Sequence, residues 1–289
     1  MTQYKDKKTS PNIGILNILS WLLAITVLFL VIARISYPII AYDVWWHMLL
    51  GKQILGTGSL IPDHSIYTWM PADAYGVYNA WLAEVLLYIT HQSGGNMGLL
   101  LIRYSIYSLF FLLAAGYAYQ RRIFPHPLAW LIILVGLMIS APAFTVKPGL
   151  FTLGFMALTV WLYFTIRHSR NNAAWMPYLF PVILILWENS HGAFFIVALF
   201  FVAIIAGEIL NVFFSPSQAL PSNVRKHLFI SLGLCIPALF INPFGYELPL
   251  HILNTVLGLA PPPDTRTKEF WPTFMFNDPP YYMLDYMIL

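Results

Sequence analysis

Apolar residues fill seven long runs of this chain, and polar residues gather at a few points between them. The runs cover residues 13–40, 97–119, 128–146, 149–166, 175–187, 192–214 and 227–241. A helix needs about 20 apolar residues to cross the hydrocarbon core of a bilayer, and most of these runs come close to that length. The pattern therefore predicts an all-α fold, a polytopic transmembrane helical bundle of about seven spans.

Two segments depart from this simple pattern. The run 175–187 is short and contains two prolines, so we expect a thin, kinked or re-entrant helix there. The segment 81–91 is too short to cross a membrane. We expect it to pack against the outer face of the bundle, with Gly94 and Gly95 leading into the next span.

The composition agrees with a membrane protein. Hydrophobic residues make up 59% of the chain and charged residues 9%, which lies outside the range of soluble domains. The net charge is +3, but Lys and Arg form no basic run, which argues against a nucleic-acid partner. Cys235 is the only cysteine, so no intrachain disulfide can form, and its apolar surroundings predict a small buried hydrophobe.

The basic residues of the short loops predict the orientation. With seven spans, the loop cations fall on one side: Lys5, Lys7, Lys8, Arg121, Arg122, Arg167, Arg170, Arg225 and Lys226. The positive-inside rule makes that side cytoplasmic. The N-terminus is then cytoplasmic, the run 13–40 is a retained signal anchor, and most of the 12 acidic residues lie on the outer side.

The first outer loop, 41–80, opens with an acid and a histidine at helical spacing. Asp43 and His47 are four residues apart, so an interfacial helix presents both on one face. Such a pair can serve as a general base with its orienting partner, or as two ligands of a divalent metal. The alternative is a helix cap beside an interfacial aromatic anchor.

More acids and a second imidazole follow in the same region. The turn 58–65 carries Asp63 and His64, and the next helix carries Trp81 and Glu84. Three acids and two histidines thus share one compact loop region. A divalent metal stays open as a cofactor, because these residues include suitable ligands but no tight ligand-spacing motif.

Three cations occur at membrane depth, where each is costly. Arg or Lys at the centre of a spanning helix costs about 2.5–3.5 kcal/mol on insertion scales. Arg34, Arg103 and Lys147 all fall near the outer headgroup level under the seven-span topology. Together they could clamp a lipid phosphate or pyrophosphate, whereas singly each could reach an ordinary phospholipid headgroup. Their common depth favours a shared site.

Four consecutive polar residues, Glu188 to His191, interrupt two apolar stretches. They are costly there unless they line a hydrated cavity or bond to one another. We favour a cavity wall. The alternative is a polar turn that caps two helices, with Gly192 supplying an unusual backbone angle.

The order of these motifs resembles that of the C-type glycosyltransferase superfamily, which includes dolichyl-phosphate mannosyltransferases and oligosaccharyltransferases. The motifs that carry the resemblance are Asp43-Val44-Trp45-Trp46-His47 followed by Gly51, Gly58 to Ser65 with Ile61-Pro62-Asp63, Trp81-Leu82-Ala83-Glu84-Val85, Lys147-Pro148, Trp187 to Gly192, Asn242 to Gly245, and Lys268-Glu269-Phe270-Trp271. The resemblance implies a first outer loop that carries the catalytic acid, at the position of Asp43, and a polyprenyl-phosphate sugar donor.

We therefore expect a multi-pass glycosyltransferase of the bacterial inner membrane. Residues 1–245 would form the transmembrane core, and 246–289 an outer tail that leads toward a further span. The expected catalytic residues are Asp43 as general base, His47 and Glu84. The expected substrate-binding residues are Arg34, Asp63, Arg103, Lys147, Glu188, Asn189 and His191. The competing hypothesis is a non-catalytic subunit or scaffold that packs its spans against other membrane protein chains.

Overall fold

The computed structural model describes residues 11–39, 43–61, 77, 79–120, 127–140, 145–169 and 174–259. Within these ranges the protein is all-α and has no β-strand, which confirms the all-α part of the prediction. The helices are α1 (Pro11–Ile35), α2 (Asp43–Thr57), α3 (Trp81–Gln120), α4 (Pro127–Ser140), α5 (Gly149–Ser169), α6 (Leu179–Glu188), α7 (Phe195–Phe214), α8 (Ser222–Ala238) and α9 (Glu247–Val256). Short 3-10 helices, Met176–Tyr178 and Gly192–Phe194, precede α6 and α7.

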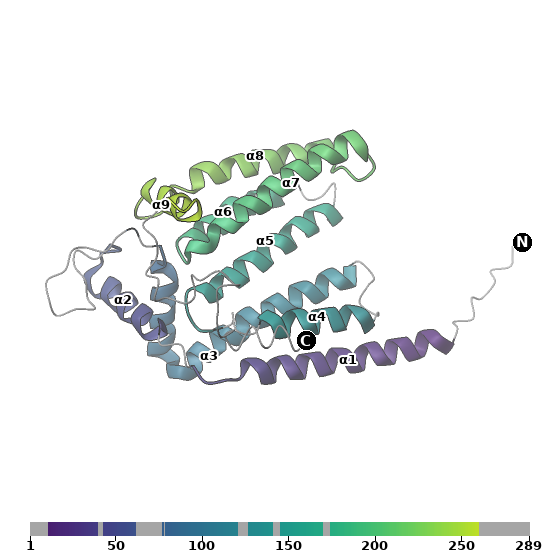
Figure 1. Ribbon diagram of the computed structural model, residues 1–289, viewed down its shortest axis with the longest axis horizontal. Coiled ribbons are helices and arrows are strands. Elements are labelled where there is room, and N and C mark those ends of the chain that lie inside the picture. Colours follow the sequence, from purple (N-terminus) through teal and green to yellow (C-terminus); the bar gives the residue numbers. More distant parts are fainter. Residues whose placement is uncertain are drawn as a thin grey trace, which may run out of the picture.

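Most of the helices form one bundle. Helices α1 and α4 to α8 and the longer part of α3 lie roughly side by side, and successive helices run in alternating directions (Figure 1). Helices α2 and α9 both lie at the same end of the bundle, which we call the α2 end. The connection between α7 and α8 lies at the opposite end, the far end.

Four helical segments are long and apolar enough to cross a membrane. They are Gly14–Ala33, Trp81–Tyr117, Gly149–Ser169 and Gly192–Phe214. The helical segments Pro127–Gly136 and Met176–Glu188 are apolar but shorter. Large apolar side chains of the long helices are widely exposed, as at Phe29 (70%) and Leu199 (68%), which suits contact with lipid rather than water. By length and composition, the chain is thus a candidate multi-pass membrane protein.

Helix α3 bends where the glycine pair predicted a change of direction. Gly95 has φ 56° and ψ −149°, a non-helical conformation that is almost exclusive to glycine. The part of α3 before Gly95 packs across the α2 end, and the part after it joins the bundle (Figure 1). This arrangement positions Glu84 beside α2.

Helix α5 lies between two apolar clusters. Its first residues, including Leu150, pack with α1, α3 and α4. Further along, Leu162 and Ile166 pack with α6, α7 and α8, in the cluster that also buries Cys235, as predicted. The residues at both ends of α5 are therefore held by packing on either side.

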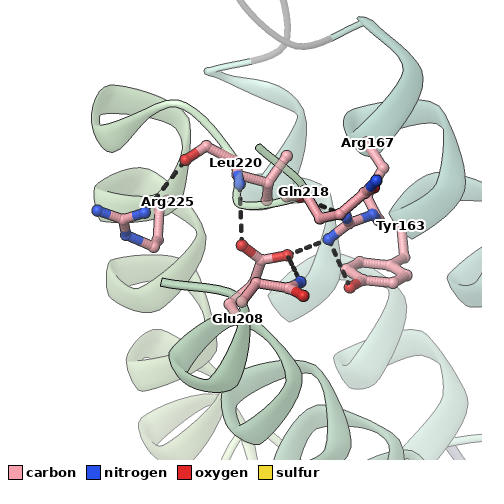
Figure 2. A network of polar contacts seen from close by, with 7 residues as sticks. Tyr163, Arg167, Glu208, Gln218, Leu220 and Arg225 are labelled. Carbon is pink, nitrogen blue, oxygen red and sulfur yellow. Dashed lines mark hydrogen bonds and ion pairs between the residues drawn. The ribbon is translucent and has the colours of Figure 1, made fainter. Parts of the chain in front are cut away.

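A buried ion pair closes the far end (Figure 2). The Arg167 guanidinium donates to Glu208 Oε1 and to the carbonyl oxygen of Gln218, the latter over 2.7 Å. Glu208 is fully buried, and its Oε2 accepts the backbone N–H of Leu220 at 3.0 Å. Sequence analysis placed Arg167 in a loop and missed its partner Glu208, although an acid inside an apolar run is itself a signal for a buried pair.

Candidate functional site

An accessible ion pair lies at the α2 end. Asp43 begins α2, and Lys147 lies in the turn just before α5. Asp43 Oδ2 and Lys147 Nζ are 3.8 Å apart, and the two side chains are 59% and 33% exposed. Because both groups remain accessible, the site offers a ligand a carboxylate and a cation side by side.

A buried carboxylate–imidazole pair lies next to it, one turn along α2. His47 Nδ1 and Glu84 Oε1 are 2.7 Å apart, and the Glu84 side chain is fully buried. When Nδ1–H donates a hydrogen bond to the Glu84 carboxylate, Nε2 is the basic nitrogen of the neutral ring. This arrangement orients His47 as a base or hydrogen-bond acceptor.

Gly51 permits this pairing, because α2 and α3 approach closely at its position. A Cβ atom at Gly51 would lie 2.3 Å from the carbonyl oxygen of Glu84. Real side chains do not tolerate such a contact, so a larger residue would push the helices apart. The glycine of the outer-loop motif thus has a packing role beside the site.

His191 faces the same region from the turn after α6. Its Nδ1 is 2.9 Å from Thr152 Oγ1 and accepts the backbone N–H of Ala193 at 3.3 Å. Burial lowers the pKa of His191, and the positive charges of Lys147 and His47 lower it further. His191 is therefore neutral near pH 7 and lies within electrostatic range of the other two residues.

Asn189 links the end of α6 to the start of α3 and to the segment that follows α8. Its side-chain amide donates to the carbonyl oxygens of Ile185 and Ile241, at 2.8 and 2.9 Å. Its Oδ1 accepts the indole N–H of Trp81 at 2.7 Å. Asn189 also lines a cavity of about 550 Å³ at this end, whose other walls are mostly apolar. Asn189 thus forms part of a cavity wall, and His191 caps the 3-10 helix that follows. The unusual backbone angle expected at Gly192 is not found, because Gly192 has no positive φ.

Glu188 is the buried acid of the turn. Its side chain is fully buried, and within the described part of the chain neither carboxyl oxygen has a hydrogen-bond partner. Glu188 ends α6, outside the four candidate spans. Burial raises the pKa of its carboxyl to about 8, so the group is mainly protonated at neutral pH. In that state it can donate a hydrogen bond.

Arg103 contacts the segment after α1. Its side chain is fully buried, its Nη2 donates to the carbonyl oxygen of Tyr37 at 2.5 Å, and its guanidinium lies 4.3 Å from the centre of the Tyr37 ring. The contacts of the described residues thus place Arg103 on Tyr37 and Lys147 on Asp43. Arg34 lies in α1, but its side chain is outside the described part, and so is all of Asp63.

The described residues contain no group of three His, Cys, Asp or Glu side chains that could hold a metal ion. Two of the residues that suggested a divalent metal, Asp63 and His64, lie outside the described ranges. The possible metal stays a prediction.

Two residues that position the site were not among the predicted site residues. Thr152 contacts His191, and Trp187 donates its indole N–H to Thr152 Oγ1 at 3.0 Å. A single threonine inside an apolar run does not by itself indicate a functional role. Only the packing of α5 against α6 shows its role.

Comparison of the chain with protein-family models, with curated proteins and with solved structures found no match.

Proposed function

We propose that this protein is a membrane glycosyltransferase that moves a sugar from a polyprenyl-phosphate donor to an acceptor hydroxyl at the α2 end. We further propose that this end faces the periplasm of a bacterial inner membrane, with seven spans formed by the seven apolar runs. Glu188 follows the run 175–187 and lies outside that span. The helices that match the seven apolar runs support this topology. The loop cations support the orientation.

The contact between Asp43 and Lys147 carries the proposal. Glycosyl transfer to a hydroxyl needs a base for the acceptor and charge stabilisation for the departing phosphate. Asp43 and Lys147 supply these groups 3.8 Å apart, on two elements that are far apart in the sequence. Both remain accessible at the end of an apolar bundle, where a lipid-linked substrate presents its headgroup.

The proposed step breaks one bond and forms another. The acceptor oxygen attacks the anomeric carbon, the bond from this carbon to the phosphate oxygen breaks, and the lipid phosphate leaves with the electron pair. Asp43 takes the acceptor proton, and Lys147 stabilises the charge on the phosphate. His47, held by Glu84, lies beside the base, and Arg34 stays a predicted phosphate ligand. Arg103 supports the site by fixing the chain at Tyr37.

The test is consumption of radiolabelled polyprenyl-phosphate monosaccharides by the full chain in nanodiscs, with membrane extract as the source of acceptor. We expect Asp43→Asn to lower turnover at least about 100-fold, because the amide keeps the shape but cannot take a proton. Glu247→Gln, an exposed acid on α9, is the control and should match the wild type.

Two outcomes would contradict the proposal. Wild-type turnover in Asp43→Asn would remove Asp43 from catalysis. Absence of turnover by the wild type with every donor, together with stable co-purification of another membrane chain, would instead favour the scaffold hypothesis.

A further inference from the structure

Three side chains form a directed hydrogen-bond relay that ends on His191. The Trp187 indole can only donate, and it donates to Thr152 Oγ1 at 3.0 Å. Thr152 Oγ1 lies 2.9 Å from His191 Nδ1. Trp187 is fully buried, so the start of the relay is shielded from competing water.

The groups that contact Nδ1 fix the tautomer of His191. Its Nδ1 accepts the backbone N–H of Ala193, which cannot act as an acceptor, so Nδ1 carries no proton. The hydroxyl proton of Thr152 therefore also points to Nδ1. In the neutral ring the single proton must then lie on Nε2.

The Nε2 atom faces the turn that carries Lys147. A Cβ atom at Gly149 would lie 3.6 Å from Nε2, so the missing side chain of this glycine leaves the space above Nε2 uncovered. Within the described part of the chain, Nε2 has no hydrogen-bond partner. The Nε2–H group and the Lys147 ammonium thus border the same turn, 147–149.

We infer that His191 is a fixed neutral hydrogen-bond donor that recognises, through Nε2–H, a phosphoryl oxygen of the substrate next to Lys147, and that Thr152 is the positioning residue that holds it in this form. The inference rests on the proposed function for the identity of the ligand. It excludes His191 as the general base, because the nitrogen that faces the site already carries the proton. This role is left to Asp43, as in the proposed function.

The test separates the tautomer from the ligand. The full chain in nanodiscs, labelled with ¹⁵N-histidine, is studied by NMR in the wild type, Thr152→Val, Thr152→Ser and Thr165→Val. His191→Gln assigns the signal. In the wild type and Thr152→Ser we expect a neutral ring with protonated Nε2. In Thr152→Val only the longer contact, 3.3 Å from the Ala193 backbone N–H, still opposes a proton on Nδ1, so we expect a mixture of tautomers. Thr165→Val is a matched control on α5, because the hydroxyl of Thr165 has no hydrogen-bond partner among the described residues.

The ligand arm uses a short-chain prenyl phosphate as the probe. Its addition should shift the His191 Nε2 signal. Thr152→Val should weaken its binding by at most about tenfold, the effect of one hydrogen bond lost in full, because part of the rings keep the Nε2–H donor, while Thr152→Ser restores the binding. A wild-type ring protonated on Nδ1 would overturn the inference, whatever the activity. A ring protonated on Nε2 that does not respond to the phosphate would support the tautomer and Thr152 but overturn the phosphoryl ligand. If the wild type responds to the phosphate but shows no turnover, the result contradicts glycosyl transfer and leaves the inference about His191 standing.

Discussion

Glu188 shows how burial of a single group can make stability depend on pH. Its pKa rises from the ordinary value of 4.5 to about 8 in the folded protein. Between these values the folded state keeps a proton that the unfolded state has released, so folding stability decreases as the pH rises through this range. Above about 8 the carboxylate is charged and buried without a partner among the described residues.

We therefore expect the wild type to lose thermal stability as the pH rises from about 4.5 to about 8, with the loss levelling off above about 8, and Glu188→Gln to lose much less, because the amide cannot ionise. Thermal unfolding in detergent across this range measures the effect. Glu247→Gln, on the exposed side of α9, should keep the wild-type dependence. Equal pH dependence of the wild type and Glu188→Gln would show that Glu188 is not the responsible group.

At the scale of a helix, the bend in α3 depends on one residue. Gly95 has φ 56°, and a Cβ atom there would meet no other atom within 4 Å. The only obstacle to a side chain at this position is therefore backbone strain, about 1–3 kcal/mol. The neighbouring Gly94 has the same open surroundings and no positive φ.

We expect Gly95→Ala to destabilise the protein by about 1–3 kcal/mol, and Gly94→Ala to be neutral or stabilising by up to about 1 kcal/mol. Unfolding in detergent of the two variants, measured side by side, gives the difference. Because the bend orients Trp81 and Glu84, Gly95→Ala should also weaken the His47–Glu84 pairing. Equal stability of the two variants would mean that the bend is not imposed by the conformation of Gly95.

At the scale of the whole molecule, the topology gives a direct prediction. Ser59 follows α2 at one end of the bundle, and Ser217 lies between α7 and α8 at the other, and both are exposed. Introduced singly into a Cys235→Ala background, Ser59→Cys and Ser217→Cys should react from opposite sides of the membrane. An impermeant maleimide on intact cells should label only Ser59→Cys, and labelling of both from outside would exclude the proposed topology.

The sequence predicted the helical bundle well because apolar run length and membrane thickness are coupled. It also located the bend of α3, since paired glycines rarely continue a helix. The sequence indicates how deep in the membrane a residue lies along its helix, but not how each helix is rotated within the bundle. The common depth of Arg103 and Lys147 therefore predicts a shared site without showing the direction of either side chain, and the described contacts of Arg103 are with Tyr37. The Thr152–His191 contact could not be predicted from the sequence, because it exists only after α5 packs against the turn that follows α6.

The ion pair of the far end has a consequence for the order of assembly. Arg167 and Glu208 are 41 residues apart, so the arginine leaves the ribosome and reaches the membrane well before its partner. A carboxylate within an apolar helix is costly to insert alone, and an arginine already in place offsets this cost. Helix α5 would then provide the surface to which α7 binds as it inserts, so that the second half of the bundle inserts only after the first half is in place.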